Sequence, residues 1–344
     1  VTQQAIAAAP ASVGSIRFLD IPPTGEACSR LQSFNQFYRC QDVDVDRYTL
    51  DGKRRTVFSI GREIDYSKLT DFQRRHFTYT HGYGLVLAPV NEIERNTGRP
   101  LWAAGGIPQR GLTFEGDNGA IYFGAQSDMP WSIVNTRQSV FNRLDSTKPV
   151  TWSGDTAVRI GSGWRRLAIT QYLGGLPYIG GGRKVWNATG GDPADENSGL
   201  LLYRDITSRL KEIAPFLTID EDPYFVAEEG RLFVMAPVYA STDQYPYAVA
   251  FSGGVRYIRQ SAMAVMDAYS GETHLYVLDD AEPITKAWRA VYPNLFTPGD
   301  KLPQSLRKHL RLGETGLNVV AEATQRFHVT DTDAFYNGDE AWAP

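Results

Sequence analysis

Strand-prone and helix-prone stretches alternate along this 344-residue chain without the regular strand–helix–strand spacing of a parallel sheet. β-Prone residues flank Glu229-Gly230 and, later, Ser270-Gly271, which is the pattern of two β-hairpins. The segment 77–90 is also β-prone, although glycines interrupt it. The sequence therefore predicts an α+β fold of mixed, mostly antiparallel sheets with peripheral helices.

Three segments have apolar residues at helical spacing. These patterns predict helices near 164–172, from 206 to about 214 behind a capping Asp205, and over 283–291. On the last helix we expect Trp288 to be buried in the core. A further helix is expected over 303–310, because proline is favoured in a first helical turn.

The distribution of glycine and proline suggests the domain organisation. Residues 1–14 are rich in alanine and indicate a linker to something upstream. Residues 174–199 contain eight glycines, which is typical of a long loop or a lobe boundary. We expect a strand-rich lobe over 15–173 and an α+β lobe over 200–344, or one continuous domain that is truncated at its C-terminus.

Composition excludes some functions. Hydrophobic residues make up 42% of the chain and the formal net charge is −4, which is typical of a globular protein. The basic residues are dispersed, whereas nucleic-acid binding needs a concentrated basic face. No apolar run approaches the roughly 18–20 residues that span a bilayer. We therefore expect no nucleic-acid partner, and any membrane attachment would come from segments absent from this chain.

Cys28 and Cys40 are the only cysteines and lie twelve residues apart. They are either the two ends of a disulfide loop or two unrelated buried thiols, and an oxidising compartment would favour the disulfide.

Familiar catalytic motifs are absent, including the nucleophile elbow, the P-loop, the dinucleotide fingerprint and the zinc-protease helix motif. His76 and His81 are five residues apart, which in an extended segment places them on opposite faces and argues against a shared metal. No catalytic or cofactor-binding residue is assigned.

Asp42, Asp44 and Asp46 alternate along a predicted strand, so their carboxylates share one face. Oxygen ligands of this kind suit calcium, and a calcium site is one hypothesis. The other is a solvated strand face with Arg47 or Lys53 nearby.

A set of short motifs occurs in order along the chain and carries a family resemblance. They are Asp42–Tyr48, Thr78–Gly84, Ala88–Asn91, Ile121–Gly124, Ala214–Thr218, Asp222–Tyr224, Tyr245–Tyr247, Tyr257–Arg259, Asp267–Tyr269 and Leu306–Arg311. Together they resemble a large uncharacterised family of bacterial multi-spanning membrane proteins, found in actinobacteria and cyanobacteria among others.

The resemblance implies several transmembrane helices followed by a large extracytoplasmic domain, of which this chain would be a part. It therefore implies a periplasmic or cell-surface location and a tether to the cytoplasmic membrane. The sequence departs from the family pattern in lacking the membrane helices, in the segment 174–199, and in stopping where the family's domain continues. The resemblance implies no activity.

Three functions follow as hypotheses, and the leading one is not enzymatic. It is a module that binds an envelope component or a partner protein. The alternative is an envelope hydrolase whose acid and base are drawn from His81, Asp222, Asp267 and Glu272, and the third is a structural role in a membrane assembly. A deep pocket that joins a histidine to a carboxylate would favour the hydrolase, whereas an exposed aromatic surface would favour binding.

Overall fold

The computed structural model describes residues 15–32, 37–40, 42–136, 140, 150–161, 163–174 and 198–342. The expected linker 1–14 and most of the glycine-rich segment 174–199 lie outside these residues. The chain forms two compact units whose bounds differ from those of the lobes expected at 15–173 and 200–344. Unit 1 comprises Val1–Ser208, Phe225–Val234 and Met266–Glu272, and unit 2 comprises Arg209–Tyr224, Met235–Val265 and Thr273–Pro344.

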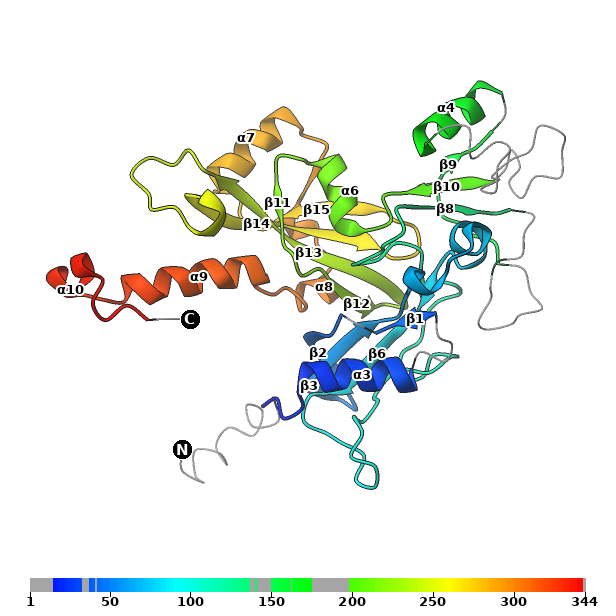
Figure 1. The fold of residues 1–344 in the computed structure, drawn as a ribbon, viewed down its shortest axis with the longest axis horizontal. Coiled ribbons are helices and arrows are strands. Elements are labelled where there is room, and N and C mark those ends of the chain that lie inside the picture. The colour runs from blue at the N-terminus through cyan, green and yellow to red at the C-terminus, as the bar shows by residue number, and fades with distance from the viewer. Residues whose placement is uncertain are drawn as a thin grey trace. The chain divides into compact units, whose positions relative to one another are not determined.

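The strands of the described residues are labelled in chain order in Figure 1. They are β1 (Tyr38–Arg39), β2 (Asp44–Leu50), β3 (Lys53–Gly61), β4 (Glu63–Ile64), β5 (Gly82–Tyr83), β6 (Leu85–Pro89), β7 (Ala120–Ile121), β8 (Trp131–Val134), β9 (Val158–Arg159), β10 (Gly199–Leu202), β11 (Thr218–Ile219), β12 (Tyr224–Glu228), β13 (Arg231–Thr242), β14 (Tyr257–Asp267), β15 (Thr273–Val277) and β16 (Phe296–Pro298).

The helical segments are mostly short. They are α3 (Ile21–Leu31), α4 (Trp164–Leu173), α6 (Ile206–Ile213), α7 (Pro283–Val291), α8 (Gln304–Arg307), α9 (Glu314–Phe327), α10 (Thr332–Asn337), the 3-10 helices η1 (Tyr66–Lys68), η3 (Ser252–Gly254) and η4 (Gly299–Lys301), and the π-helix η2 (Arg74–Thr78).

In unit 1, an antiparallel sheet of order β2-β3-β6 is covered by helix α3 (Figure 1). Asp20 begins α3, because its carboxylate accepts a hydrogen bond from the N–H of Ile21 (2.9 Å). Cys28 of α3 packs with Ile60 and Val86 of the sheet in one buried cluster. This layer of helix on sheet is the scaffold of the candidate site.

A second sheet of unit 1, of order β8-β10-β9, is also antiparallel. Phe77 packs in the same buried cluster as Trp131 and Ile133 of β8. The expected strand over 77–90 is therefore wrong at its start, since Phe77 lies in the π-helix η2 and only β5 and β6 are strands. Burial of Phe77 among these residues outweighs the local β-propensity.

The largest sheet has the order β11-β13-β14-β15-β16, and β12 pairs with β13. Its long strands β13 and β14 each belong partly to unit 1 and partly to unit 2. The hairpin at Glu229-Gly230 is confirmed, and both residues have the positive φ that a tight hairpin turn requires (50° and 71°). The α+β class with mostly antiparallel sheets is confirmed.

Three predicted helices are found where the sequence places them. Helix α4 spans Trp164–Leu173, as expected near 164–172. Helix α6 ends at Ile213, and the carboxylate of Asp205 accepts a hydrogen bond from the N–H of Ser208 (2.8 Å), as the capping pattern predicts. Helix α7 spans Pro283–Val291, and Glu282 caps it by accepting from the N–H groups of Ile284 (3.1 Å) and Thr285 (2.5 Å). The helix expected over 303–310 is shorter than predicted, because α8 covers Gln304–Arg307 alone.

Candidate functional site

The four residues considered for acid–base chemistry have other contacts. His81 is buried, with its Nδ1 3.2 Å from Thr80 Oγ1 and its ring 4.7 Å from that of Tyr122. The carboxylate of Asp267 accepts from the N–H groups of Tyr269 (3.0 Å) and Ser270 (2.7 Å) and pairs with Arg231 (2.7 Å), so it holds the second hairpin turn.

Glu272 is exposed at the end of that turn, and Asp222 belongs to unit 2, where it pairs with Arg311 (2.9 Å). All four residues lie in the described part of the chain. The hydrogen bonds, ion pairs and ring contact above do not join any two of them as an acid–base pair. Hydrolysis therefore remains a prediction without geometric support.

The three aspartates proposed as a calcium site differ in how far they are buried. Asp44 of β2 is buried opposite Ser59, whereas Asp42 and Asp46 are half-buried. Within the described ranges, no group of three or more His, Cys, Asp or Glu side chains has an arrangement that could hold a metal ion. The calcium site remains a prediction to be tested by titration.

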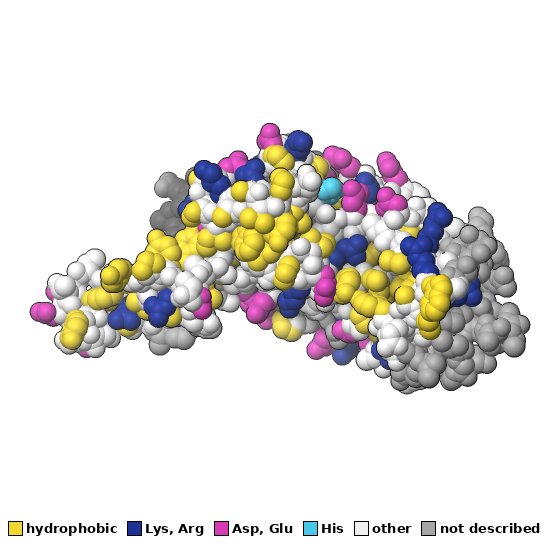
Figure 2. Space-filling model, turned by 90° about the horizontal axis from the view of Figure 1, so that it is seen from above, with side chains coloured by type: hydrophobic (Ala, Val, Ile, Leu, Met, Phe, Trp, Pro, Cys, Tyr) yellow, Lys and Arg dark blue, Asp and Glu magenta, His cyan; other side chains and the backbone are white. Residues whose placement is uncertain are grey.

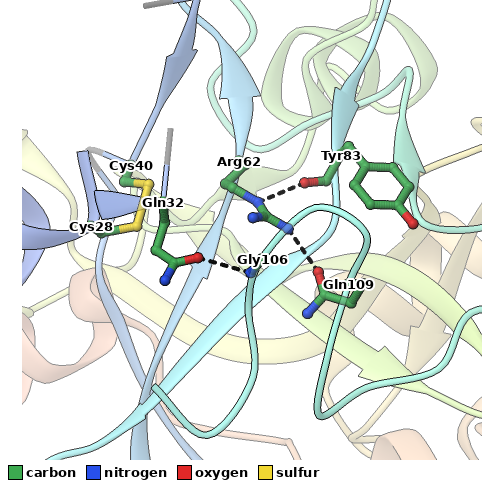
Figure 3. Close-up of a disulfide and its surroundings, with 7 residues drawn as sticks. All are labelled: Cys28, Gln32, Cys40, Arg62, Tyr83, Gly106 and Gln109. Atoms are coloured by element: carbon green, nitrogen blue, oxygen red, sulfur yellow. Dashed lines mark hydrogen bonds between the residues drawn. A yellow bond between two sulfur atoms is a disulfide. The ribbon is translucent and has the colours of Figure 1, made fainter. Parts of the chain in front are cut away.

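Cys28 and Cys40 form a disulfide, with Cα atoms 5.8 Å apart (Figure 3). Both residues are buried, and the half-buried Trp102 packs against their cluster. The disulfide ties the last turn of α3 to the segment before β2. It thereby fixes the position of Gln32, whose N–H donates to Cys28 O (2.7 Å).

A cavity of about 370 Å³ lies beside this disulfide in unit 1. Its lining residues are Gln32, Trp102, Ala103, Ala104, Gly105, Gly106, Ile107, Pro108 and Arg110. Trp102 supplies an apolar wall, Arg110 supplies a charge, and the segment between them supplies backbone polar groups. Ligand cavities commonly have this mixture of apolar surface and a few polar groups.

Residues 105–110 form the loop that lines the cavity, which we call the cavity loop. Hydrogen bonds hold it in place at both ends (Figure 3). The Gly106 N–H donates to Gln32 Oε1 (2.8 Å), and Gly106 has a φ of +80°, which favours glycine. Gly105 and Arg110 exchange two backbone hydrogen bonds of 3.0 and 2.7 Å, which close the loop. The loop therefore has a defined shape before any ligand binds.

The fully buried Arg62 anchors the far side of this loop. Its Nη2 donates to Gln109 Oε1 and Gln109 Nε2 donates to Leu85 O, both at 2.7 Å, while Arg62 Nε donates to Tyr83 O (2.8 Å; Figure 3). Gly84 (φ +73°) must lack a side chain, because a Cβ there would collide with Gln109 and Arg62. The cavity loop is thus linked to both the disulfide and the sheet.

A separate surface of unit 2 is aromatic. Trp288 stacks on Phe216 with ring centroids 3.9 Å apart, and Tyr292 stacks on Phe216 at 5.5 Å. Val291 and Tyr292 are 61% and 46% exposed. Hydrophobic side chains, drawn in yellow, form patches on the face of the molecule that Figure 2 shows. The expected burial of Trp288 in the core is wrong. The apolar stripe of α7 faces this partly exposed aromatic cluster instead.

The cavity residues Gln32, Trp102 and Arg110 were not predicted from the sequence. The available signal was the run of glycines at 105, 106 and 111 around Pro108, which is typical of a shaped loop. It carried no information about Gln32, which the fold brings to the loop from 74 residues away.

Comparison with known proteins gives the family. Residues 1–344 match the model of a family that is described as "Uncharacterised protein family (UPF0182)". It is 32% identical to a UPF0182 protein of Pelotomaculum thermopropionicum over 99% of this chain and 37% of that protein. UPF0182 proteins of Alkaliphilus metalliredigens and Methanospirillum hungatei are each 34% identical, over 96% of this chain and 35% and 37% of their own lengths.

The chain therefore spans little more than a third of these curated relatives. No solved structure matches it significantly. The whole-length match and the relatives above 30% identity agree with the resemblance carried by the ordered motifs, and the chain belongs to the uncharacterised protein family UPF0182.

Proposed function

We propose that this chain is an extracytoplasmic binding module, which holds an envelope component in the cavity between Gln32, Trp102 and Arg110. The observation that carries the proposal is the preorganised loop of that cavity, which is hydrogen-bonded at both ends and backed by a disulfide. A binding loop that is already ordered loses less conformational entropy when the ligand binds.

The proposed location rests on the disulfide, because structural disulfides persist in oxidising compartments and are rare in the cytosol. We further propose, from the family resemblance, that segments outside this chain tether the full-length protein to the cytoplasmic membrane. The length of the relatives, of which the chain spans 37% or less in the three cases above, leaves room for such segments.

A protein partner is the second candidate ligand, and the aromatic surface of unit 2 favours it. Tryptophan and tyrosine are enriched at the energetic centres of protein interfaces. The stacked rings of Phe216, Trp288 and Tyr292 restrict one another, so this surface offers rigid apolar area.

The test is co-sedimentation of the purified protein with isolated cell-wall and membrane fractions of the organism that encodes it. We expect binding to one fraction, and we expect Arg110→Gln to weaken that binding about tenfold, since a hydrogen bond to a charged group contributes about 1.5–3 kcal/mol. Arg99→Gln is the matched control, because Arg99 is also exposed and lies outside the cavity lining.

Equal binding by both variants would exclude the cavity as the site, and the absence of binding to every fraction would contradict the function. The location has its own test. Titration of the unfolded, unreduced protein should detect no free thiol, whereas two reactive thiols per chain would remove the support for an oxidising compartment.

A further inference from the structure

A second cavity, of about 290 Å³, lies in unit 1 and does not share its lining with the loop cavity. Its lining includes Thr70, Phe72, Arg75, His76, Asp128 and Met129. Phe72 and Met129 provide apolar walls, and the other four side chains bring polar groups to the same space. None of them belongs to the binding function proposed above.

Arg75 is the unusual member of this cavity. Its Nε atom is buried and has no hydrogen-bond partner, and no carboxylate in the described part of the chain forms an ion pair with its guanidinium group. A buried donor without a partner is costly, particularly on a charged group, and such atoms in native proteins often mark the place of a bound ion or ligand.

The nearby negative charge is already neutralised. Asp128 of the cavity pairs with Arg39, with Arg39 Nη1 2.7 Å from Asp128 Oδ2. Of the aspartate and the arginine that line the cavity, Asp128 is therefore paired with Arg39, and Arg75 is left without an ion pair in the described part of the chain. The cavity is consequently suited to an anion.

The backbone that presents Arg75 has an uncommon conformation. Arg75 and His76 lie in the π-helix η2, and single-turn π-helices are frequent at functional sites. His76 Nδ1 lies 3.1 Å from Trp131 O, and because a carbonyl oxygen can only accept, Nδ1 carries the proton. The imidazole also stacks on Trp131 at 3.7 Å, so its orientation at the cavity wall is fixed.

From these observations we infer that this cavity is an oxyanion-binding site, in which Arg75 binds the carboxylate or phosphate group of a small organic ligand. The guanidinium Nε supplies a donor that the fold leaves unused, and the anion supplies the missing counter-charge. The hydroxyl group of Thr70 is a further donor on the cavity wall, and Phe72 and Met129 contact the apolar part of the ligand.

Thermal unfolding with sodium phosphate or sodium acetate, at constant ionic strength set by chloride, tests the site. A ligand that binds only the folded state raises Tm by mass action. We expect one of the two anions to raise the Tm of the wild-type protein and of Arg95→Gln, an exposed arginine with the same charge change. Arg75→Gln should bind that anion at least about tenfold more weakly. The anion that acts identifies the group as a carboxylate or a phosphate.

The ligand-free variants separate binding from a structural role. Arg75→Gln should be at least as stable as the control, because it removes a charge that has no ion-pair partner among the described residues. A fall in Tm beyond that of Arg95→Gln would assign Arg75 a structural role and overturn the inference. So would the absence of any anion effect on the wild type, or an equal effect on Arg75→Gln. Arg75→Lys keeps the charge without the Nε donor and gives the same comparison if Arg75→Gln fails to fold.

Discussion

Glu63 is a single residue whose burial has a measurable consequence. It lies in β4 opposite Arg39 and is only 6% exposed. Burial raises the pKa of Glu63 from 4.5 to about 7, and the nearby carboxylates of Asp42 and Asp205 act in the same direction. Arg39 and the N–H of Gln126 oppose this rise without cancelling it. The folded protein therefore favours the protonated form of Glu63.

The sign of the pH dependence follows from the raised pKa. The contribution of protonated Glu63 to stability is fully present below pH 4.5 and is lost as the pH rises through about 7. We expect Glu63→Gln, which cannot ionise, to be more stable than the wild type at pH 8 by about 3 kcal/mol, and nearly equal to it at pH 4.5.

Urea unfolding at both pH values measures this difference. Glu212→Gln, at an exposed position of α6, is the matched control and should show no such gain. A stability difference between Glu63→Gln and the wild type that is the same at both pH values would contradict the predicted ionisation.

At the scale of the element, α9 of unit 2 depends on a cap from elsewhere in the chain. The helix has no buried residue, and its N-cap is Gly313, which has no side chain to accept hydrogen bonds. The fully buried Asp220 replaces that cap by accepting from the N–H groups of Glu314 (3.2 Å) and Thr315 (3.0 Å). Its carboxylate also accepts from the hydroxyl of Tyr239 (2.7 Å). Asp220 therefore joins the start of α9 to the sheet of unit 2.

We expect Asp220→Ala to lower the free energy of unfolding by about 2 kcal/mol or more, because several buried donors lose their acceptor. The N–H groups of α9 should also exchange faster with deuterium. Asp331→Ala removes the exposed cap of α10 and serves as the control, with an expected loss below about 1 kcal/mol. If the two variants lost the same stability, Asp220 would be an ordinary cap rather than the anchor of α9.

At the scale of the whole molecule, the net charge and the exposed apolar side chains bear on whether the chain binds lipid or DNA by itself. The formal net charge is −4, and in the described part of the chain no helix is both long and apolar enough to span a bilayer. Some apolar side chains are nevertheless exposed, among them Leu317 and Phe327 of α9 (56% and 55%). The net negative charge provides no long-range attraction to anionic lipid.

We therefore expect the protein to remain in the supernatant when it is sedimented with neutral or anionic lipid vesicles at physiological salt. Duplex DNA should not change the mobility of the protein either, since the basic residues are dispersed along the sequence and the net charge is −4. Pelleting with neutral vesicles that is abolished by Leu317→Ser and Phe327→Ser would identify α9 as a lipid-binding element and contradict this expectation.

Local signals in the sequence determined several elements. The hairpin at Glu229-Gly230 was predictable because β-prone residues flank a glycine, and Gly230 adopts the positive φ of a tight turn without steric cost. Helix α7 was predictable because Pro283 is favoured in a first turn and the apolar residues recur at helical spacing. In each case the determining interactions lie within a few residues along the chain. The ordered motifs likewise indicated the family.

The tertiary structure alone decided the candidate sites. Gln32 reaches the loop at Gly106, and Asp220 reaches the start of α9, across 74 and 94 residues of chain. The lack of a hydrogen-bond partner for Arg75 Nε among the described residues and the partial exposure of Trp288 also depend on which distant segments pack beside them. Spacing within a sequence shows which side chains share a face of one element. The packing between elements determines which of those faces is covered and which charges are neutralised, and therefore where a ligand can bind.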